Sequence, residues 1–419
     1  MALKKYALSD VCTIVPGFAF KSNEFGSGEN IAVKIKDIEP PSVNIKNAER
    51  VCFTPQDKFR LSKGDYIMAM TGATIGKVGK LQIDAKNVYI NQRVCKFNPI
   101  TSVCDKEYLY YVLSAPSFRN FIYNNVDSKL AQPNIGHPTI YKYTHLFPTD
   151  IKEQKLIASV LNNIDRKIEL NKQINDNLEA MAKQLYDYWF VQFDFPNEEG
   201  KPYKSSGGAM VWNENLKRKI PQGWNDCKIK DFMRIFTGKK DVSKAVPGNY
   251  KFFSCAPEPI SSNEYIYDGY AVLVSGNGSY TGRVGFYKGK FDLYQRTYAC
   301  VLDEDEHNIS FFYYTLRYLF QPIYSGGKHG SSIPYIVLGD LADFRFAFNE
   351  TICTKFVDAT KPMFDEQLLR QKEIEVLTKQ RDELLPLLMN GQATVNYHLS
   401  AFRGFTTRLQ IHAFTIKSS

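Results

Sequence analysis

The chain has 419 residues, a length that suits two or three domains, each able to bury its own core. Hydrophobic residues make up 44% and charged residues 23%, and no apolar run approaches the roughly 18 residues that a membrane span needs. The formal net charge of +9 suits a polyanionic partner such as nucleic acid, although plain solubility explains this charge equally well.

The eight cysteines form no C-x-x-C pair, which argues against a zinc ribbon. His137 and His329 have no second ligand at a useful spacing, so we expect no bound metal. The opening residues MALKKYALSD lack the apolar core of a signal peptide. We therefore expect reduced thiols and a cytoplasmic protein without a membrane partner.

Residues 1–148 contain short runs of Val, Ile, Tyr and Phe broken by Gly, Pro and Asn, which predicts a mixed α/β domain with a mainly antiparallel sheet. Within it, MTGATIGKVG (70–79) looks like a phosphate-binding loop. Gly72 and Gly76 are one residue too close for that loop, however, and Val78 replaces the required Ser or Thr. We expect a hairpin instead, in which strand YIMAM turns back through glycines that serve as scaffold.

Three sets of polar residues in this domain are candidates for DNA contact. Thr71, Thr74 and Lys77 are expected to be exposed at the hairpin tip, where they suit phosphate or groove contact. The triplet Asn91, Gln92 and Arg93 suits base reading, because Gln pairs with adenine and Arg with guanine; an ordinary strand with exposed polar residues fits it equally well. The third set lies in the Gly- and Pro-punctuated loop 127–140 and comprises Lys129 and Gln132.

Residues 151–194 contain neither Gly nor Pro and predict one long helix. Apolar residues recur every seven positions, with one Asn of the kind that fixes register in coiled coils. A helix of about 38 residues would reach roughly 57 Å. The seam residues are Ile157, Ile164, Asn171, Leu178 and Leu185.

A connector rich in Gly, Pro and Ser covers 195–225, and a second mixed α/β domain covers 226–350. The second domain repeats the first. In our alignment Tyr66 matches Tyr270, Gly72 matches Gly276, and Gly76 matches Gly282 after a two-residue insertion. The corresponding candidates for DNA contact are Ser275, Tyr280, Arg283, Gln295, Arg296, Lys328 and His329.

Residues 352–391 predict a closing helix, for which Pro362 suits the start and Gly391 a C-cap, and in which Pro386 predicts a kink or a break. Its apolar seam predicts an antiparallel coiled coil with the first helix. The fold class is therefore α+β, with two repeated domains separated by two long helices in a pseudo-two-fold arrangement. The tail 392–419 has no assigned role. The seam residues are Ile374, Leu377, Leu384 and Leu388.

No motif for catalysis stands out. The segment EPPS at 39–42 lacks the residues of an amino-methyltransferase motif, no G-x-G-x-x-G seats a methyl donor, and the match of DIKEQK to a nuclease motif is at chance level. Together these observations favour a binding protein over an enzyme.

The chain resembles the specificity (S) subunit of type I restriction–modification systems. The resemblance rests on KQLYDYWFVQFDFP (183–196), IPQGW (220–224), RDELLPLLMNGQATV (381–395) and the helix from residue 151 to 173, and it extends to about residue 395. It implies two target-recognition domains, each reading one half of a bipartite, asymmetric site in double-stranded DNA. The half-sites are expected roughly one helical turn, ~34 Å, apart.

The resemblance also implies partners. Two methyltransferase subunits would dock on the helices, hold S-adenosylmethionine and methylate adenine N6, and motor-nuclease subunits that use ATP and Mg would join through them. This chain itself would bind no cofactor and catalyse nothing.

Two other classes remain open on the residues alone. A self-contained nuclease or methyltransferase would modify DNA unaided, and a coiled-coil interaction protein would be indifferent to DNA sequence at moderate salt.

Overall fold

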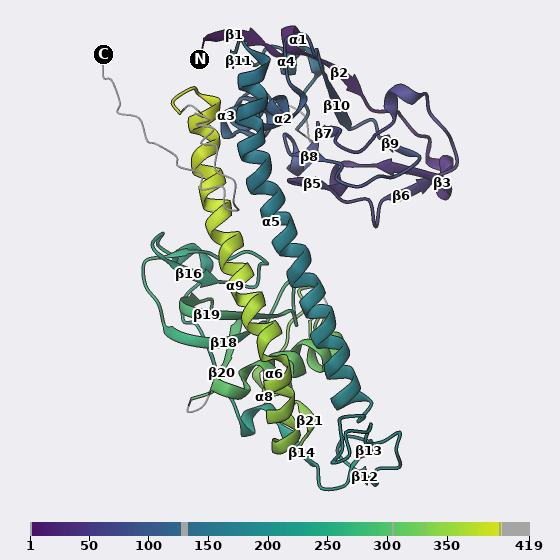
Figure 1. Cartoon of the computed structure of the whole chain (residues 1–419), viewed down its shortest axis with the longest axis vertical. Helices are drawn as coiled ribbons and strands as arrows, with labels where there is room; N and C mark the ends of the chain where they lie inside the picture. Colours follow the sequence, from purple (N-terminus) through teal and green to yellow (C-terminus); the bar gives the residue numbers. More distant parts are fainter. Residues whose placement is uncertain (1, 127–132, 304–305, 331, 394, 396–419) are drawn as a thin grey trace, which may run out of the picture. The chain divides into compact units, whose positions relative to one another are not determined.

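The computed structural model describes residues 2–126, 133–303, 306–330, 332–393 and 395. The chain divides into two compact units, which we treat separately. Unit 1 comprises Met1–Leu170 with Glu373–Ser419, and unit 2 comprises Asn171–Lys372. Two long helices, α5 (Ile151–Tyr186) and α9 (Glu350–Met389), each contribute a segment to both units (Figure 1).

Unit 1 builds its sheets from short strands. The main sheet has the order β2-β10-β7-β8-β5-β4, with β5 and β8 parallel, and β6-β3-β9 and β1-β11 form two smaller sheets. The elements are β1 (Leu3–Ala7), α1 (Leu8–Val11), β2 (Cys12–Pro16), β3 (Phe25–Val33), β4 (Ile38–Glu39), β5 (Ser42–Val43), β6 (Glu49–Val51), β7 (Tyr66–Ala69), β8 (Val78–Lys80), β9 (Val88–Ile90), β10 (Val94–Pro99), α2 (Lys106–Ser114), α3 (Pro116–Asn124), α4 (His137–Tyr141) and β11 (Thr144–Pro148).

Unit 2 repeats this plan with the sheet order β15-β20-β18-β19-β16-β17, in which β16 and β19 are parallel, beside the pairs β14-β21 and β12-β13. Its elements are β12 (Met210–Asn213), β13 (Arg218–Pro221), β14 (Asn225–Lys228), β15 (Arg234–Thr237), β16 (Tyr250–Phe253), β17 (Ile260–Ser262), β18 (Tyr267–Ser275), β19 (Val284–Leu293), β20 (Thr297–Val301), α6 (Ile309–Thr315), α7 (Gln321–Tyr324), α8 (Leu338–Ala342) and β21 (Arg345–Phe348). The predicted mixed, mainly antiparallel sheets are confirmed.

Local sequence explains why the central elements form. All four residues of β7 are buried, as expected for a strand that has neighbours on both edges and cover on both faces. Helix α2 begins after Asp105, whose carboxylate accepts the backbone N–H groups of Glu107 and Tyr108. One face of α2 then packs its aromatic residues into the core of unit 1.

The two long helices run antiparallel within each unit. In unit 1, Asp165 of α5 pairs with Arg381 of α9. In unit 2, the side-chain amide of Gln367 on α9 donates to the carbonyl of Asn175 on α5. The predicted Asn171 is 1% exposed, as a register-setting residue should be. The predicted antiparallel helix pair is thus confirmed (Figure 1).

Two details of the closing helix differ from the prediction. Helix α9 begins at Glu350 because Asn349 caps it, with its Oδ1 accepting the N–H of Ile352 at 3.1 Å, so Pro362 lies in the helix interior rather than at its start. The predicted break at Pro386 is also wrong. The helix continues through Pro386 and ends at Met389, so this proline lies within the last turn.

Candidate nucleic-acid interface

Each unit carries the predicted glycine hairpin, formed by β7 and β8 in unit 1 and by β18 and β19 in unit 2. A glycine closes each turn. The N–H of Gly76 donates to the carbonyl of Ala69 at 2.9 Å, and the N–H of Gly282 donates to Ser275 at 2.8 Å. Both glycines have positive φ, +77° and +79°, which L side chains rarely adopt. These glycines shape the turn, as the sequence indicated.

The predicted alignment of the two hairpins is wrong in one place. The sequence matched Gly72 with Gly276 and placed a two-residue insertion after them. Backbone hydrogen bonds match Gly72 with Gly278 instead, because each donates its N–H to a proline carbonyl in the following loop, Pro133 and Pro334, both at 2.9 Å. The two turns are therefore equally long.

The strands that enter the two turns shift in the same way. Their register makes Val272, rather than Tyr270, the counterpart of Tyr66. Strand β18 begins further from its turn than β7 does and so carries an additional tyrosine. Matching tyrosines by identity therefore shifted the alignment of the strands by two residues.

The two Gln-Arg pairs lie in exposed turns at matching places. Gln92 and Arg93 connect β9 to β10, and Gln295 and Arg296 connect β19 to β20. Each pair is fixed to the glycine turn of its own unit. The carbonyl of Arg93 accepts the N–H of Met70 at 2.9 Å, and that of Arg296 accepts the corresponding N–H in unit 2 at 2.9 Å. The side chains of both pairs thus project from a rigid backbone frame.

The third predicted loop joins the same frame. In unit 1 the N–H of Ile135 donates to the carbonyl of Met70 at 3.1 Å, and in unit 2 Ile336 donates to Gly276 at 2.9 Å. In each unit the glycine turn, the Gln-Arg turn and this loop therefore form one hydrogen-bonded group, which we call the loop cluster. The structure brings together, twice, three segments that lie far apart in the sequence.

The side chains of the third loop are described only in part. Lys129 and Gln132 lie outside the described residues. Lys328 and His329 are exposed, and Nε2 of His329 lies 3.1 Å from a carboxylate oxygen of Asp340. In unit 2 this loop therefore offers the exposed Lys328 and a His329 that is paired with a carboxylate.

The exposure expected for the hairpin tips is only partly correct. Tyr280 is 47% exposed, as predicted, whereas Ser275 is 3% exposed and donates its hydroxyl to the carbonyl of Cys255. Thr71 and Thr74 are half-buried, and their hydroxyl oxygens have no hydrogen-bond partner within the described part of the protein. Ser275 is buried because it ends a central strand rather than opening the tip.

The two basic residues of the hairpins also differ from the expectation of a free tip. Lys77 is half-buried. The guanidinium of Arg283 donates to the carbonyls of Ala256 and Pro257 at 2.6 and 3.2 Å, and burial lowers the pKa of Arg283. Arg283 therefore braces the neighbouring loop.

Sequence reasoning missed a fourth segment of the cluster. Gly17 follows β2 and Gly238 follows β15, and both pass directly beneath the Gln-Arg turns. A Cβ atom on Gly17 would lie 1.9 Å from the carbonyl oxygen of Asn91, and one on Gly238 would lie 1.5 Å from that of Leu293. The sequence does contain a signal for this close approach, since a glycine ends a strand in each unit, Gly17 within PGF and Gly238 within TGK. Asn91 itself is 7% exposed and supports the turn.

Different chemistry stabilises the turn in each unit. In unit 1, Phe18 stacks on Phe53 with ring centroids 5.3 Å apart and meets Phe59 at 5.4 Å. In unit 2, the carboxylate of Asp292, which is 1% exposed, accepts from Ser262 at 3.0 Å and from the ammonium of Lys240 at 3.3 Å.

Lys240 connects this polar network to the Gln-Arg turn, because its carbonyl accepts the N–H of Gln295 at 3.0 Å. In unit 1 the segment beside the turn is thus anchored by aromatic packing of Phe18, and in unit 2 it is anchored by an ion pair between Lys240 and a buried carboxylate.

The predicted seam residues lie on α5 and α9 with varied burial. Asn171 lies 3.5 Å from the guanidinium of Arg370. The buried ones are Ile157, Asn171, Ile374 and Leu388, and the half-buried ones are Ile164, Leu178, Leu185, Leu377 and Leu384.

Chemically, each loop cluster suits recognition, since it presents an exposed Gln-Arg pair on a hydrogen-bonded backbone frame. Within the described ranges no grouping of His, Cys, Asp and Glu could hold a metal ion. None of the helices in the described part of the chain is long and apolar enough to cross a membrane.

Comparison with known proteins gives a consistent picture. A family model described as the type I restriction modification DNA specificity domain matches residues 2–180 and 221–348. The type I restriction enzyme MjaIX specificity subunit of Methanocaldococcus jannaschii is 27% identical over 319 residues, which cover 69% of this chain and 69% of that protein. The EcoDI specificity subunit of Escherichia coli is 33% identical over 182 residues, 42% of this chain and 40% of that protein.

A solved structure shares the fold. The crystal structure of a type I restriction–modification system S subunit from M. genitalium superposes with a TM-score of 0.57 at 17% identity, covering 93% of this chain and 96% of that chain.

Proposed function

The chain belongs to the family of type I restriction–modification DNA specificity domains, and we propose that each of its two units reads one half of a single split DNA sequence. It is a recognition subunit and not the catalytic one. The observation that carries the proposal is the loop cluster, which recurs in both units with the same backbone hydrogen bonds and the same Gln-Arg pair. The other side chains of the two clusters differ, so the two half-sites should differ as well.

In this proposal the target-recognition domains are 1–148 and 226–350, joined by the connector 195–225. The spacer segments, predicted as 151–194 and 352–391, contain α5 (Ile151–Tyr186) with a π-helical turn to Val191, and α9 (Glu350–Met389). The tail 392–419 has no assigned role. The helices would set the distance between the half-sites that the domains read.

The residues proposed to meet DNA take two roles. Gln92 and Arg93 in unit 1, with Gln295 and Arg296 in unit 2, are exposed and suit base edges in the major groove. The remaining residues suit phosphate contact or support of the loops. The full proposed set is Thr71, Thr74, Lys77, Asn91, Gln92, Arg93, Lys129, Gln132, Ser275, Tyr280, Arg283, Gln295, Arg296, Lys328 and His329.

The family implies DNA and complex partners, and the finer assignment is part of the proposal. Two methyltransferase subunits would dock on the helices. In unit 2 a cavity of about 540 Å³ is lined by Met181, Leu185, Tyr188 and Met363 together with three polar residues, Gln184, Asp187 and Gln192, and Met181 is 51% exposed on α5. Such exposed apolar side chains suit a protein partner. Motor-nuclease subunits would join through the methyltransferase subunits.

The cofactors S-adenosylmethionine, ATP and Mg would be held by those partners, and none by this chain. Its location would be the cytoplasm, where its DNA substrate lies.

Selection from a random duplex library tests the proposal. The purified full-length chain is mixed with the library at moderate salt, and the bound DNA is sequenced. We expect one motif with two unlike halves and a fixed spacer, which stays enriched as salt weakens phosphate contacts. Enrichment without sequence preference, lost as salt rises, would overturn the proposal.

A further inference from the structure

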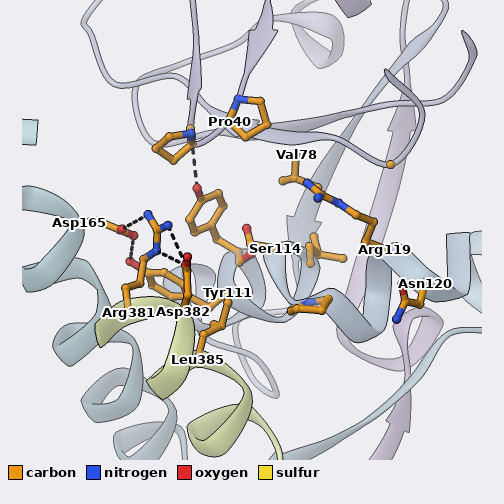
Figure 2. Close-up of a pocket in the computed structure, with 15 residues that line it drawn as sticks. Pro40, Val78, Tyr111, Ser114, Arg119, Asn120, Asp165, Arg381, Asp382 and Leu385 are labelled. Atoms are coloured by element: carbon orange, nitrogen blue, oxygen red, sulfur yellow. Dashed lines mark hydrogen bonds and ion pairs between the residues drawn. The ribbon is translucent and has the colours of Figure 1, made fainter. Parts of the chain in front are cut away.

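A carboxylate on α5 holds the globular part of unit 1 against its helices. Asp165 accepts the phenol hydroxyl of Tyr111, on α2, at 2.7 Å and the guanidinium of Arg381, on α9, at 3.2 Å. Its side chain is 19% exposed and that of Arg381 is 23% exposed. Figure 2 shows these three residues converging at one side of a cavity. Three elements thus meet at one carboxylate.

The same corner of α2 reaches the recognition hairpin. Tyr110, the neighbour of Tyr111, donates its hydroxyl to the carbonyl of Pro41 at 3.2 Å, and Lys80 on β8 donates its N–H to that same carbonyl at 2.9 Å. Strand β8 is the return strand of the glycine hairpin. Val78 of the hairpin also belongs to the same hydrophobic core as Leu161 of α5 and Leu385 of α9. A cavity of about 600 Å³ lies beside this packing, with Val78 and Asp165 among the residues that line it (Figure 2). The tyrosine pair therefore adds a polar link to the apolar packing between the hairpin and the helices.

Unit 2 contains a second carboxylate with the same arrangement. Glu179 on α5 accepts the hydroxyl of Tyr318 at 2.7 Å and that of Tyr313 at 3.3 Å. From α9, the side-chain amide of Gln367 donates to it at 3.2 Å. Burial and the nearby carboxylate raise the pKa of Tyr318, which keeps this phenol a hydrogen-bond donor.

Here too the carboxylate is connected to the return strand of the hairpin. Arg317 lies with its Nε 3.9 Å from Glu179, and another nitrogen of the same guanidinium donates to the carbonyl of Val284 at 3.0 Å. Val284 begins β19, as Val78 begins β8 in unit 1. In both units, therefore, a carboxylate on α5 is connected to the return strand of the hairpin, although the connecting residues differ.

The repetition is specific in the sequence as well as in the contacts. Asp165 and Glu179 each follow a predicted seam residue, Ile164 and Leu178, and they lie two heptads apart. Phenol and guanidinium donors to a carboxylate are charge-assisted and hold their partners in a defined geometry. An exposed ion pair between flexible side chains contributes less, because solvent screens it and both side chains lose freedom on pairing.

We propose that Asp165 and Glu179 are positioning residues, each of which fixes the recognition hairpin of its own unit on the helix pair and so makes the spacing between half-sites strict. This inference rests on the proposed function. Neither residue contacts DNA in this account, so the bases selected should not depend on them.

The test uses the full-length chain and the split site found by library selection. Binding is measured to that site and to versions whose spacer is one base pair longer or shorter. For the wild type we expect a penalty of about tenfold for the altered spacer, since one base pair both shifts and rotates a half-site. Asp165→Asn and Glu179→Gln should reduce this penalty to about twofold while the preferred bases stay the same.

Asp176→Asn is the matched control, because Asp176 is an exposed carboxylate on the same helix. It should keep the full spacer penalty. Tyr111→Phe and Tyr318→Phe remove only a hydroxyl and should act like the carboxylate variants, which keeps the test decisive if an α5 variant does not fold.

A uniform loss of binding to all spacers, with the penalty unchanged, would overturn the inference, because a merely structural residue would behave in that way. If the wild type selects no split site at all, the proposed function fails, and not only this inference.

Discussion

The two loop clusters share a backbone and differ in what stabilises it. In both units a glycine turn, a Gln-Arg turn and a third loop exchange equivalent N–H to carbonyl bonds. In unit 1 the N–H of Phe18 donates to the carbonyl of Ile90, just before the Gln-Arg turn, and its ring stacks on Phe53, whereas in unit 2 the turn is bound to Lys240, whose ammonium pairs with the buried Asp292. The two units therefore share the backbone frame and the Gln-Arg pair and differ in the side chains that support them.

Breaking the shared frame should have the largest effect. Gly238→Ala places a Cβ 1.5 Å from the carbonyl oxygen of Leu293, so the backbone must move. We expect a loss of at least about 3 kcal/mol in the free energy of unfolding and a loss of reading at the half-site of unit 2 alone. Gly17→Ala should do the same for the other half-site.

Gly339→Ala serves as the control, since a Cβ at Gly339 would meet nothing within 4 Å. Denaturant unfolding and library selection measure the two effects. If Gly238→Ala affected both half-sites equally, the independence of the two clusters would be contradicted.

The two units should also differ in how their stability depends on pH. His145 on β11 is 8% exposed, and burial lowers its pKa to about 4 from 6.5, so the folded state holds it neutral. The unfolded chain binds a proton near pH 6.5, and stability from this residue therefore falls as pH drops from about 6.5 to about 4, by about 3 kcal/mol.

The backbone register makes Phe346 the counterpart of His145 in unit 2. His145→Phe should remove this part of the acid sensitivity, measured as the difference between variant and wild type in unfolding free energy at pH 7.5 and at pH 4.5. An identical pH dependence in both proteins would contradict the assignment.

The buried ion pair of unit 2 should matter more than the exposed one beside it. Asp292→Asn leaves Lys240 without its buried partner and should cost about 2 kcal/mol and loosen selection at one half-site. Glu264 also pairs with Lys240 but is 57% exposed. Glu264→Gln should therefore cost less than about 0.5 kcal/mol. Equal costs for the two variants would show that burial does not set the strength of this network.

Each Gln-Arg pair should determine the base preference at one half-site only. Gln92→Ala or Arg93→Ala should relax the preference at one half-site about tenfold, and Gln295→Ala or Arg296→Ala should relax it at the other. Library selection with each variant measures the change position by position. An even loss over all sequences would mark these residues as phosphate contacts or as supports of the fold.

The smallest effect is expected from a residue that only one unit has. Lys239 is exposed beside the Gln-Arg turn of unit 2, where unit 1 has Phe18 after the corresponding glycine. Lys239→Ala should weaken binding a few-fold for all sequences. The slope of the logarithm of the binding constant against the logarithm of salt concentration should become shallower by about one released ion. A changed base preference without a change in salt slope would contradict a phosphate role.

Much of this molecule could be predicted from local pattern. The heptad spacing around Asn171 indicated the helix pair, and the glycine turn predicted the hairpins. The alignment failed at Gly72 because identical residues were matched without knowledge of strand pairing, and register is set by hydrogen bonds between segments distant in sequence.

Tertiary contacts account for what the sequence did not reveal. Ser275 was predicted to be exposed at the hairpin tip, but it ends a buried strand. The role of Gly17 follows only from its close approach to the backbone of Asn91, which the sequence alone does not reveal. The roles proposed for Asp165 and Glu179 depend on tyrosines from other helices, which no spacing within α5 predicts.

The most direct test of the central claim is the methylation pattern of the native host with and without this gene, read by single-molecule sequencing. We predict that one split, asymmetric N6-methyladenine motif disappears when the gene is removed. If every motif persists unchanged while the methyltransferase partners are expressed, the claim that this chain selects the DNA sequence is contradicted.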